Sequence, residues 1–211
     1  MKRNLKLSSK ELKYLVAFLA VVTVTVSALT YTQLSPPYTD QFFSMWIVGP
    51  NGLASNYYPN NNPTLIPGEE VNWVVGVYNH MNALEYVVVR VKLLNATEIA
   101  PNELTGVASP APEIFEFARI LVNNETWMIS FPWEIIDTST ANNVMTITRL
   151  VVNGTTLSGN LAQAVGGSDF RFVFELWFYD PNGGTLVFSW STPSSSYSAW
   201  TQLWFNVTGG T

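Results

Sequence analysis

The chain has 211 residues, of which 47% are hydrophobic and 12% charged, and it contains no cysteine. This length allows one membrane helix plus one sizeable domain, and the missing cysteine excludes disulfides, thiolate metal sites and thiol catalysis. The net charge of −5 is unevenly spread, because five of the ten basic residues lie within the first thirteen positions. The remainder is acidic and repels phosphate backbones, so we expect no nucleic-acid binding.

The segment 14–32 contains no charged residue and follows a basic tail at 1–13. As a helix it would rise about 28 Å, which is close to the thickness of a bilayer's hydrocarbon core. Tyrosines at both ends and the positive charges before it favour a cytoplasmic N-terminus with the rest of the chain outside. The sequence therefore predicts a single-pass protein of the cell membrane, held in lipid by this helix. The alternative is a secretory signal cleaved after Ala28.

After a Pro-containing spacer at 33–41, the chain shows short apolar or alternating runs separated by turn residues. The predicted strands are 42–48, 71–78, 86–94, 115–122, 126–135, 144–152, 170–179, 185–190 and 198–207. About nine strands at this spacing predict an all-β fold, an antiparallel immunoglobulin-like β-sandwich over 42–208 with a short tail at 209–211.

Two stretches lack a strand pattern. The first, between Asn95 and Glu113, is rich in Pro and Ala and is expected to form a loop or lid. The second, 157–168, is expected to be an irregular insert. In the predicted strand 86–94, which precedes both stretches, alternation directs Arg90 and Lys92 away from the core.

Four Asn-x-Thr sequons follow the predicted membrane segment, at Asn95, Asn124, Asn153 and Asn206. Three of them lie at predicted strand ends or turns, where a glycosylated asparagine has to be. We therefore expect N-glycans in a host that attaches them. The alternative is that these are ordinary surface asparagines of turns.

The aromatic residues suggest a contact surface. Because side chains alternate along a strand, Trp200 and Trp204 share the outward face with the sequon residue Asn206. Trp177 and Tyr179 share the face of their strand opposite the predicted core. If the two strands are neighbours, these four residues form an exposed patch typical of a protein or glycan contact. The alternatives are an insert packed over the patch, or a β-bulge that reverses the alternation.

No catalytic motif is present. His80 is the only histidine and there is no cysteine, so a structural zinc site of the usual kind cannot be assembled. No supporting motif accompanies a serine triad around His80. The acidic pairs 69/70, 113/116 and 134/137 are the sole candidates for carboxylate catalysis. We predict no catalytic residue, no metal and no cofactor.

Several motifs in order resemble a known family. They are IVGPNGLA at 47–54, LIPGEE at 65–70, VGVYNH at 75–80, FELWFY at 174–179 and WFNVT at 204–208. Together they resemble the uncharacterised archaeal and bacterial membrane-protein family catalogued as domain of unknown function 1616. The resemblance covers most of 42–208. It implies a membrane-anchored outer domain with an immunoglobulin-like sandwich, and it implies no activity.

These observations predict a non-catalytic surface domain that docks onto another membrane or envelope protein, or serves as an accessory subunit of a membrane complex. A carbohydrate-binding module that uses exposed tryptophans is the alternative from another class. A hydrolase that works with carboxylates is a third.

Overall fold

The computed structural model describes residues 9–34, 41–191 and 195–209, which fall into two separate units divided after Thr39. Residues 1–8 of the predicted tail, residues 35–40 of the predicted spacer, 192–194 and 210–211 lie outside the described residues. So do the side chains at 11, 28 and 31–34 of the helix.

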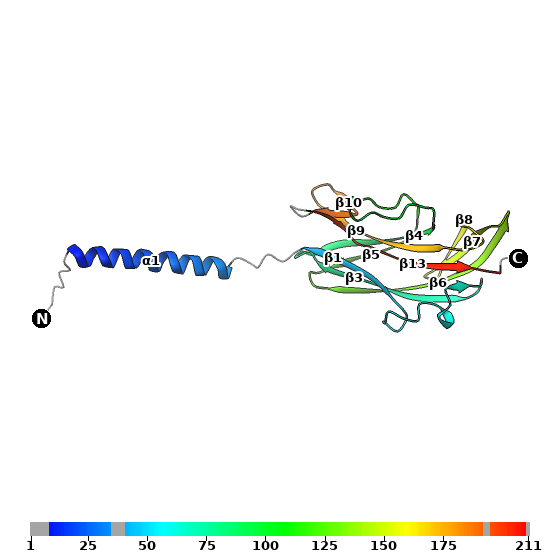
Figure 1. The fold of residues 1–211 in the computed structure, drawn as a ribbon, viewed down its shortest axis with the longest axis horizontal. Helices are drawn as coiled ribbons and strands as arrows, with labels where there is room; N and C mark the ends of the chain where they lie inside the picture. Colours follow the sequence, from blue (N-terminus) through cyan, green and yellow to red (C-terminus); the bar gives the residue numbers. More distant parts are fainter. Residues whose placement is uncertain (1–8, 35–40, 192–194, 210–211) are drawn as a thin grey trace. The chain divides into compact units, whose positions relative to one another are not determined.

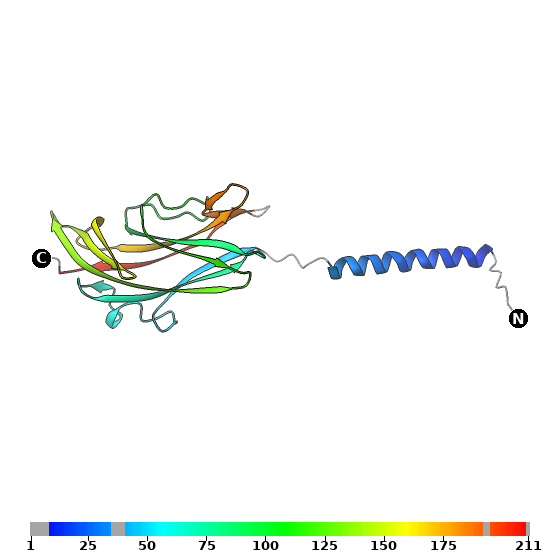
Figure 2. The same cartoon turned by 180° about the vertical axis from the view of Figure 1, so that it is seen from behind.

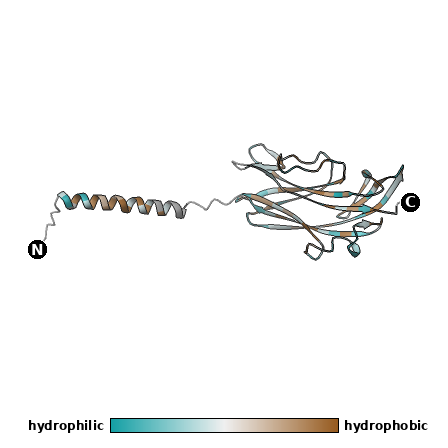
Figure 3. Cartoon of the chain, in the orientation of Figure 1, coloured by the Kyte–Doolittle hydropathy of each residue, from teal (hydrophilic) through white to brown (hydrophobic). Residues whose placement is uncertain are grey.

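The first unit contains helix α1 (Ser9–Leu34), which extends beyond the predicted segment at both ends. Apolar side chains dominate most of its length (Figure 3). The hydroxyls of Thr23, Thr25 and Thr30 donate to the carbonyls four residues earlier, at 2.8–2.9 Å, so these polar groups are satisfied within the helix. Among the described residues, no helix has both the length and the apolar character needed to cross a membrane.

The second unit is built almost entirely from strands. They are β1 (Phe42–Val48), β2 (Thr64–Leu65), β3 (Glu70–His80), β4 (Glu85–Asn95), β5 (Glu113–Leu121), β6 (Thr126–Ala141), β7 (Val144–Val152), β8 (Thr155–Val165), β9 (Phe170–Asp180), β10 (Thr185–Val187), β11 (Ser189–Ser191), β12 (Ser196–Ser198) and β13 (Trp200–Val207), with a short 3-10 turn at Pro59–Asn61.

Two sheets form the layers of this domain. Sheet 1 has the order β1-β3-β6-β7-β8, and sheet 2 has the order β2-β13-β9-β4-β5 with β10 added beside β9. All pairs in these sheets are antiparallel except the short pairing of β2 with β13. Figures 1 and 2 show the two layers from opposite sides, which confirms a sandwich of antiparallel sheets.

The core lies between the layers and is strongly aromatic. Alternation along each strand turns one set of side chains inward, and the largest of these are fully buried. They include Trp73, Phe131 and Trp133 from sheet 1, and Phe172 and Phe174 from sheet 2. Their rings meet mostly edge to face at centroid distances of about 5–6.5 Å, the arrangement that aromatic pairs prefer.

The predicted strand bounds agree with the structure at β1 and β7, and the loop predicted between Asn95 and Glu113 is present. One prediction is wrong: most of the stretch 157–168, expected to be irregular, is strand β8 at the edge of sheet 1. The predicted strand 185–190 is two short strands, and 198–207 is interrupted between β12 and β13. With β2, these pieces raise the number of strands above the nine expected.

Candidate functional site

Strand β13 has the alternation that the sequence predicts. Leu203 packs against the core, and Phe205 and Val207 are buried in it. Trp200 and Trp204 point to the other side, the outer face of sheet 2, where Trp200 is half-buried and Trp204 is 38% exposed. The outward orientation of both tryptophans is therefore as predicted.

The neighbouring strand β9 departs from the prediction. Its outer face was expected to be open, yet Arg171, Val173 and Glu175 are almost completely buried there. Trp177 is half-buried, and Tyr179 at the end of the strand is 42% exposed. Most of this face is thus covered, which was the alternative considered for the patch.

The register also separates the four predicted contact residues. Trp200 pairs with Glu175, and Trp204 pairs with Arg171 four residues away on β9. Trp177 lies diagonally across from Trp200, and Tyr179 lies beyond it. Trp204 and Tyr179 therefore lie at opposite ends of the row, and the four side chains do not form one continuous patch.

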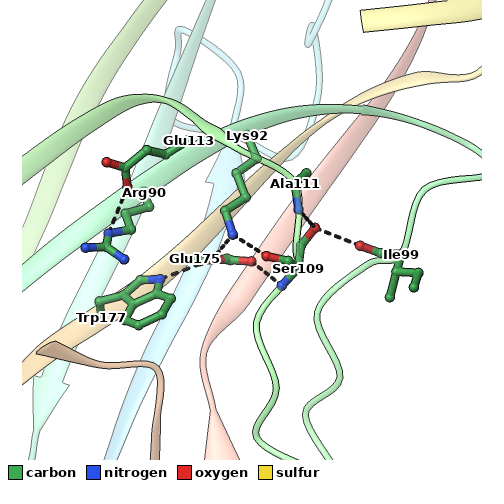
Figure 4. Close-up of polar contacts among 8 residues, drawn as sticks. All are labelled: Arg90, Lys92, Ile99, Ser109, Ala111, Glu113, Glu175 and Trp177. Carbon is green, nitrogen blue, oxygen red and sulfur yellow. Dashed lines mark hydrogen bonds and ion pairs between the residues drawn. The ribbon is translucent and has the colours of Figure 1, made fainter.

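The cover comes from residues 96–112, here called the covering loop. Its anchor is Ser109, whose amide N–H donates to Glu175 Oε1 at 2.7 Å. The Lys92 ammonium lies 2.9 Å from Glu175 Oε2 and donates to the Ser109 carbonyl at 2.6 Å. Figure 4 shows this arrangement under the loop, and the Trp177 indole N–H completes it with a 3.1 Å bond to Glu175 Oε2.

This buried ion pair corrects the expectation for Lys92, which points away from the core as predicted but is only 5% exposed. Apolar side chains of the same outer face surround the pair, and those that are buried are Val88, Leu94, Val173 and Phe188. A buried pair is tolerated only where further hydrogen bonds complete it, as Ser109 and Trp177 do here. The outer face of sheet 2 therefore has a small core of its own.

Two arginines lie over tryptophan rings on this outer face. Arg90 lies over the Trp177 ring at 4.3 Å from its centroid, and Arg171 lies over the Trp204 ring at 4.5 Å. The Arg171 guanidinium also donates to Gln202 Oε1 at 3.0 Å and to the Glu98 carbonyl at 2.6 Å. Burial lowers the pKa of Arg171, and the charge of Glu98 opposes that shift. Arg171 thus ties the covering loop to the sheet through the Glu98 carbonyl, whereas Arg90 joins β4 to β5 and β9 within sheet 2.

The outer face of sheet 1 is different. Across β1, β3 and β6 the register places three rows side by side, Ser44–Tyr78–Thr126, Trp46–Gly76–Met128 and Val48–Val74–Ser130. We call these nine residues the neutral face, because none of them is charged. Charge appears only beyond the next pair on this side, where Glu70 lies opposite Glu134.

The centre of the neutral face is an indole lying on a glycine. A Cβ atom at Gly76 would lie 2.1 Å from Trp46 Cε2, so the ring lies directly against the β3 backbone. Met128, on the other side of Gly76, is 47% exposed. A flat aromatic surface beside a protruding thioether side chain is thus presented outward.

In the described part of the chain, no segment comparable to the covering loop is hydrogen-bonded across the neutral face. The segment after β1 lies beside the start of β3 and is bonded to the core and to sheet 2. The Tyr57 carbonyl accepts the inward Trp73 indole N–H at 2.6 Å, and the Tyr58 hydroxyl donates to the Trp204 carbonyl. Burial, with a smaller contribution from Tyr57, raises the pKa of Tyr58, so this hydroxyl keeps its proton.

Sequence reasoning missed the neutral face, although two signals were present. The run VNWVVGVY is apolar on both faces, which predicts a strand covered on both sides. A glycine inside such a run marks a place where another group approaches the backbone closely. Together they point to the open face of β3.

The sequon asparagines differ in exposure and in their hydrogen bonds. Asn124 and Asn153 are exposed in turns with φ of 63° and 49°, the left-handed conformation that asparagine tolerates. Asn95 is half-buried, and its amide donates to the Gln163 carbonyl at 2.6 Å. Asn206 lies within β13 and accepts a bond from the Asp169 amide at 2.9 Å. Asn153, at the β7–β8 turn, has the least engaged side chain of the four.

Three further residues considered for catalysis or metal binding contact neighbouring side chains. His80 Nδ1 lies 2.6 Å from Asn124 Oδ1, in the turn next to β3. Of the acidic pairs, Glu113 is 3.0 Å from Arg90, and Asp137 is 2.5 Å from Arg149. These are surface or structural ion pairs.

No protein-family model matches this chain, and no curated protein sequence matches it either. Among solved structures, it is similar to a β-glucosidase from intestinal bacteria involved in saponin metabolism, with 14% identity and a TM-score of 0.35 over 80% of this chain and 16% of that one. It is also similar to a β-glucosidase from Kluyveromyces marxianus, with 7% identity and a TM-score of 0.29 over 80% of this chain and 15% of that one. This chain thus spans about a sixth of the length of those enzymes. At these TM-scores the likeness supports no assignment of activity.

Proposed function

We propose that the β domain is a non-catalytic docking domain and that the neutral face is its contact surface. The observation that carries this proposal is the uncovered face of sheet 1 across β1, β3 and β6, with Trp46 on Gly76 at its centre. Sheet faces that carry aromatic and aliphatic side chains on central strands are normally covered. An uncharged, aromatic centre with polar surroundings is the composition of a protein interface.

A contact residue can be tested without harming the fold. Met128 is exposed, so Met128→Glu should change the free energy of unfolding by about 0.5 kcal/mol or less. In a complex, however, it would place an unpaired charge in a desolvated interface, which costs several kcal/mol. The matched control is Ile120→Glu, because Ile120 is 56% exposed on the other sheet.

The measurement is copurification of the full-length protein in mild detergent from its own host. Wild type and Ile120→Glu should retain the same stoichiometric partner, and Met128→Glu should lose it. Equal retention by both variants would place the contact elsewhere and refute the docking role of the neutral face.

We also propose that this domain lies outside the cytoplasm, as the basic tail and apolar segment before it predict and as the resemblance to the uncharacterised membrane family implies. The exposed turn at Asn153 gives a direct test, because an N-glycan is attached only to the translocated side. Intact-mass analysis of protein from its own glycosylating host should show a glycan that Asn153→Gln removes. A bare polypeptide at all four sequons would count against this location.

A further inference from the structure

This inference rests on the docking function proposed above and names the partner. We propose that the neutral face binds a second copy of the same chain, related to the first by a two-fold axis that runs along β3. The proposal follows from the shape of the face, its charge, the direction of its strands and its area.

The shape is complementary to itself. A two-fold axis along β3 exchanges the positions of β1 and β6, which flank β3 on either side. Met128 of one copy then meets the flat surface formed by Trp46 and Gly76 of the other, and the same contact recurs on the other side of the axis. Repetition of each contact is the rule of a two-fold interface, and a methionine sulfur against an indole is a favourable pair.

Charge restricts where two copies can meet. After residue 13 the chain has five basic and fourteen acidic residues, so two β domains repel each other over most of their surfaces. The neutral face brings no charged side chains together. Its nearest charges, Glu70 and Glu134, lie two rows beyond the Val48–Val74–Ser130 row on β3 and β6. Between two acidic domains the long-range electrostatic force is repulsive, and salt screens it. Added salt should therefore strengthen this association, whereas it would weaken binding to a basic partner.

The choice of axis follows from strand direction. Rotation about an axis parallel to β3 leaves the strands of both copies running the same way. Gln41, just before β1, therefore lies at the same end of the domain in both copies. Two chains attached to the same surface through the segments before Gln41 require this arrangement. A two-fold axis across the strands would place the two Gln41 residues at opposite ends.

The area predicts a weak dimer. Three strands about 4.8 Å apart and three rows about 6.8 Å apart cover roughly 300 Å² on each copy. Stable interfaces bury about 800 Å² per partner, so this face alone is well below that size. We expect association that depends on concentration and that grows when the chains share one surface.

The absence of cysteine makes a clean crosslinking test possible. Val74 lies on β3 and therefore next to the axis, and its copies should face each other. Facing sheets are about 10 Å apart, which is too far for a direct disulfide but within reach of a short bis-maleimide. The control is Ala118→Cys, an exposed residue of β5 on the other sheet.

In the full-length protein, Val74→Cys should give crosslinked dimers and Ala118→Cys should not, which excludes association through α1 as the cause. Adding Met128→Glu should weaken dimerisation about tenfold or more, as loss of a central contact does. Higher salt should increase the crosslinked fraction.

Equal crosslinking of the two cysteine variants, or none at the highest concentration, would overturn the dimer. If Met128→Glu then still abolished copurification of a different protein, the docking function would stand with another occupant. If it changed neither measurement, both proposals would fail.

Discussion

The outer faces of the two sheets differ in whether the chain itself covers them. Both sheets have central strands with apolar side chains on the side away from the main core. On sheet 2 the chain covers this side itself, with the covering loop fixed by Ser109 to the Lys92–Glu175 pair. On sheet 1 the described chain supplies no such hydrogen-bonded cover, and the half-buried Trp46 lies on Gly76. This difference is the reason why we propose a partner for the outer face of sheet 1.

The largest effect should come from breaking the cover of sheet 2. Glu175→Leu would leave the buried Lys92 ammonium without its counter-charge and remove the acceptor for Ser109 and Trp177. Loss of one partner of a buried pair typically costs about 3–5 kcal/mol, which urea denaturation would measure. The double variant with Lys92→Met should recover most of this loss. A loss near zero for the single variant would show that the covering loop is not needed for stability.

A smaller effect is expected at the centre of the neutral face. Gly76→Ala places a methyl group against the Trp46 ring and should displace it, at a cost of about 1–3 kcal/mol. In a Trp46→Ala background the same change should be nearly neutral, because the methyl group then has room. A double-mutant cycle by chemical denaturation measures the difference. Equal costs in both backgrounds would contradict the contact between ring and glycine.

The predicted contact tryptophans should contribute less again. Trp204 is 38% exposed, so Trp204→Ala should lower the free energy of unfolding by about 1 kcal/mol. Phe174→Ala, in the main core, should cost about 3–5 kcal/mol by comparison. Thermal melting of the two variants decides between these values. Similar losses would mean that the outer face of sheet 2 is buried as deeply as the core.

The smallest effect concerns the start of β4. Burial raises the pKa of the Glu85 carboxyl, so the folded state holds this proton more tightly than the unfolded chain does. The resulting stabilisation is complete below the unfolded pKa and is lost as the pH rises through the folded value. Glu85→Gln should therefore raise stability by a few tenths of a kcal/mol at neutral pH, since the group is only half-buried and solvent screens the effect, and should have no benefit in acid. A lower melting temperature at neutral pH would contradict this sign.

Much of the strand pattern was readable from the sequence, because alternation and turn residues are local signals. Strand β8 was missed because its sequence, TTLSGNLAQAV, has few β-branched or aromatic residues and a glycine at its centre. It is held as an edge strand by pairing with β7, not by its own propensity.

The buried ion pair and the neutral face were beyond local reading for a different reason. Lys92 was correctly directed away from the core, but alternation does not show what a distant loop places over it. Trp46 and Met128 are more than eighty positions apart in the sequence, and only the pairing of β1 and β6 with β3 brings them to one row. Such pairings are non-local properties of the fold.

The position of β1 also has a mechanical consequence. Any pull on the N-terminus enters the β domain at Phe42 and passes along a strand joined to β3 by seven consecutive residue pairs. If the domain is gripped through sheet 1, this force acts parallel to the strands and loads the hydrogen bonds of the ladder together, in shear. Peeling would instead break them one after another at much lower force. Gripped in that way, the domain would resist a pull on its N-terminal end.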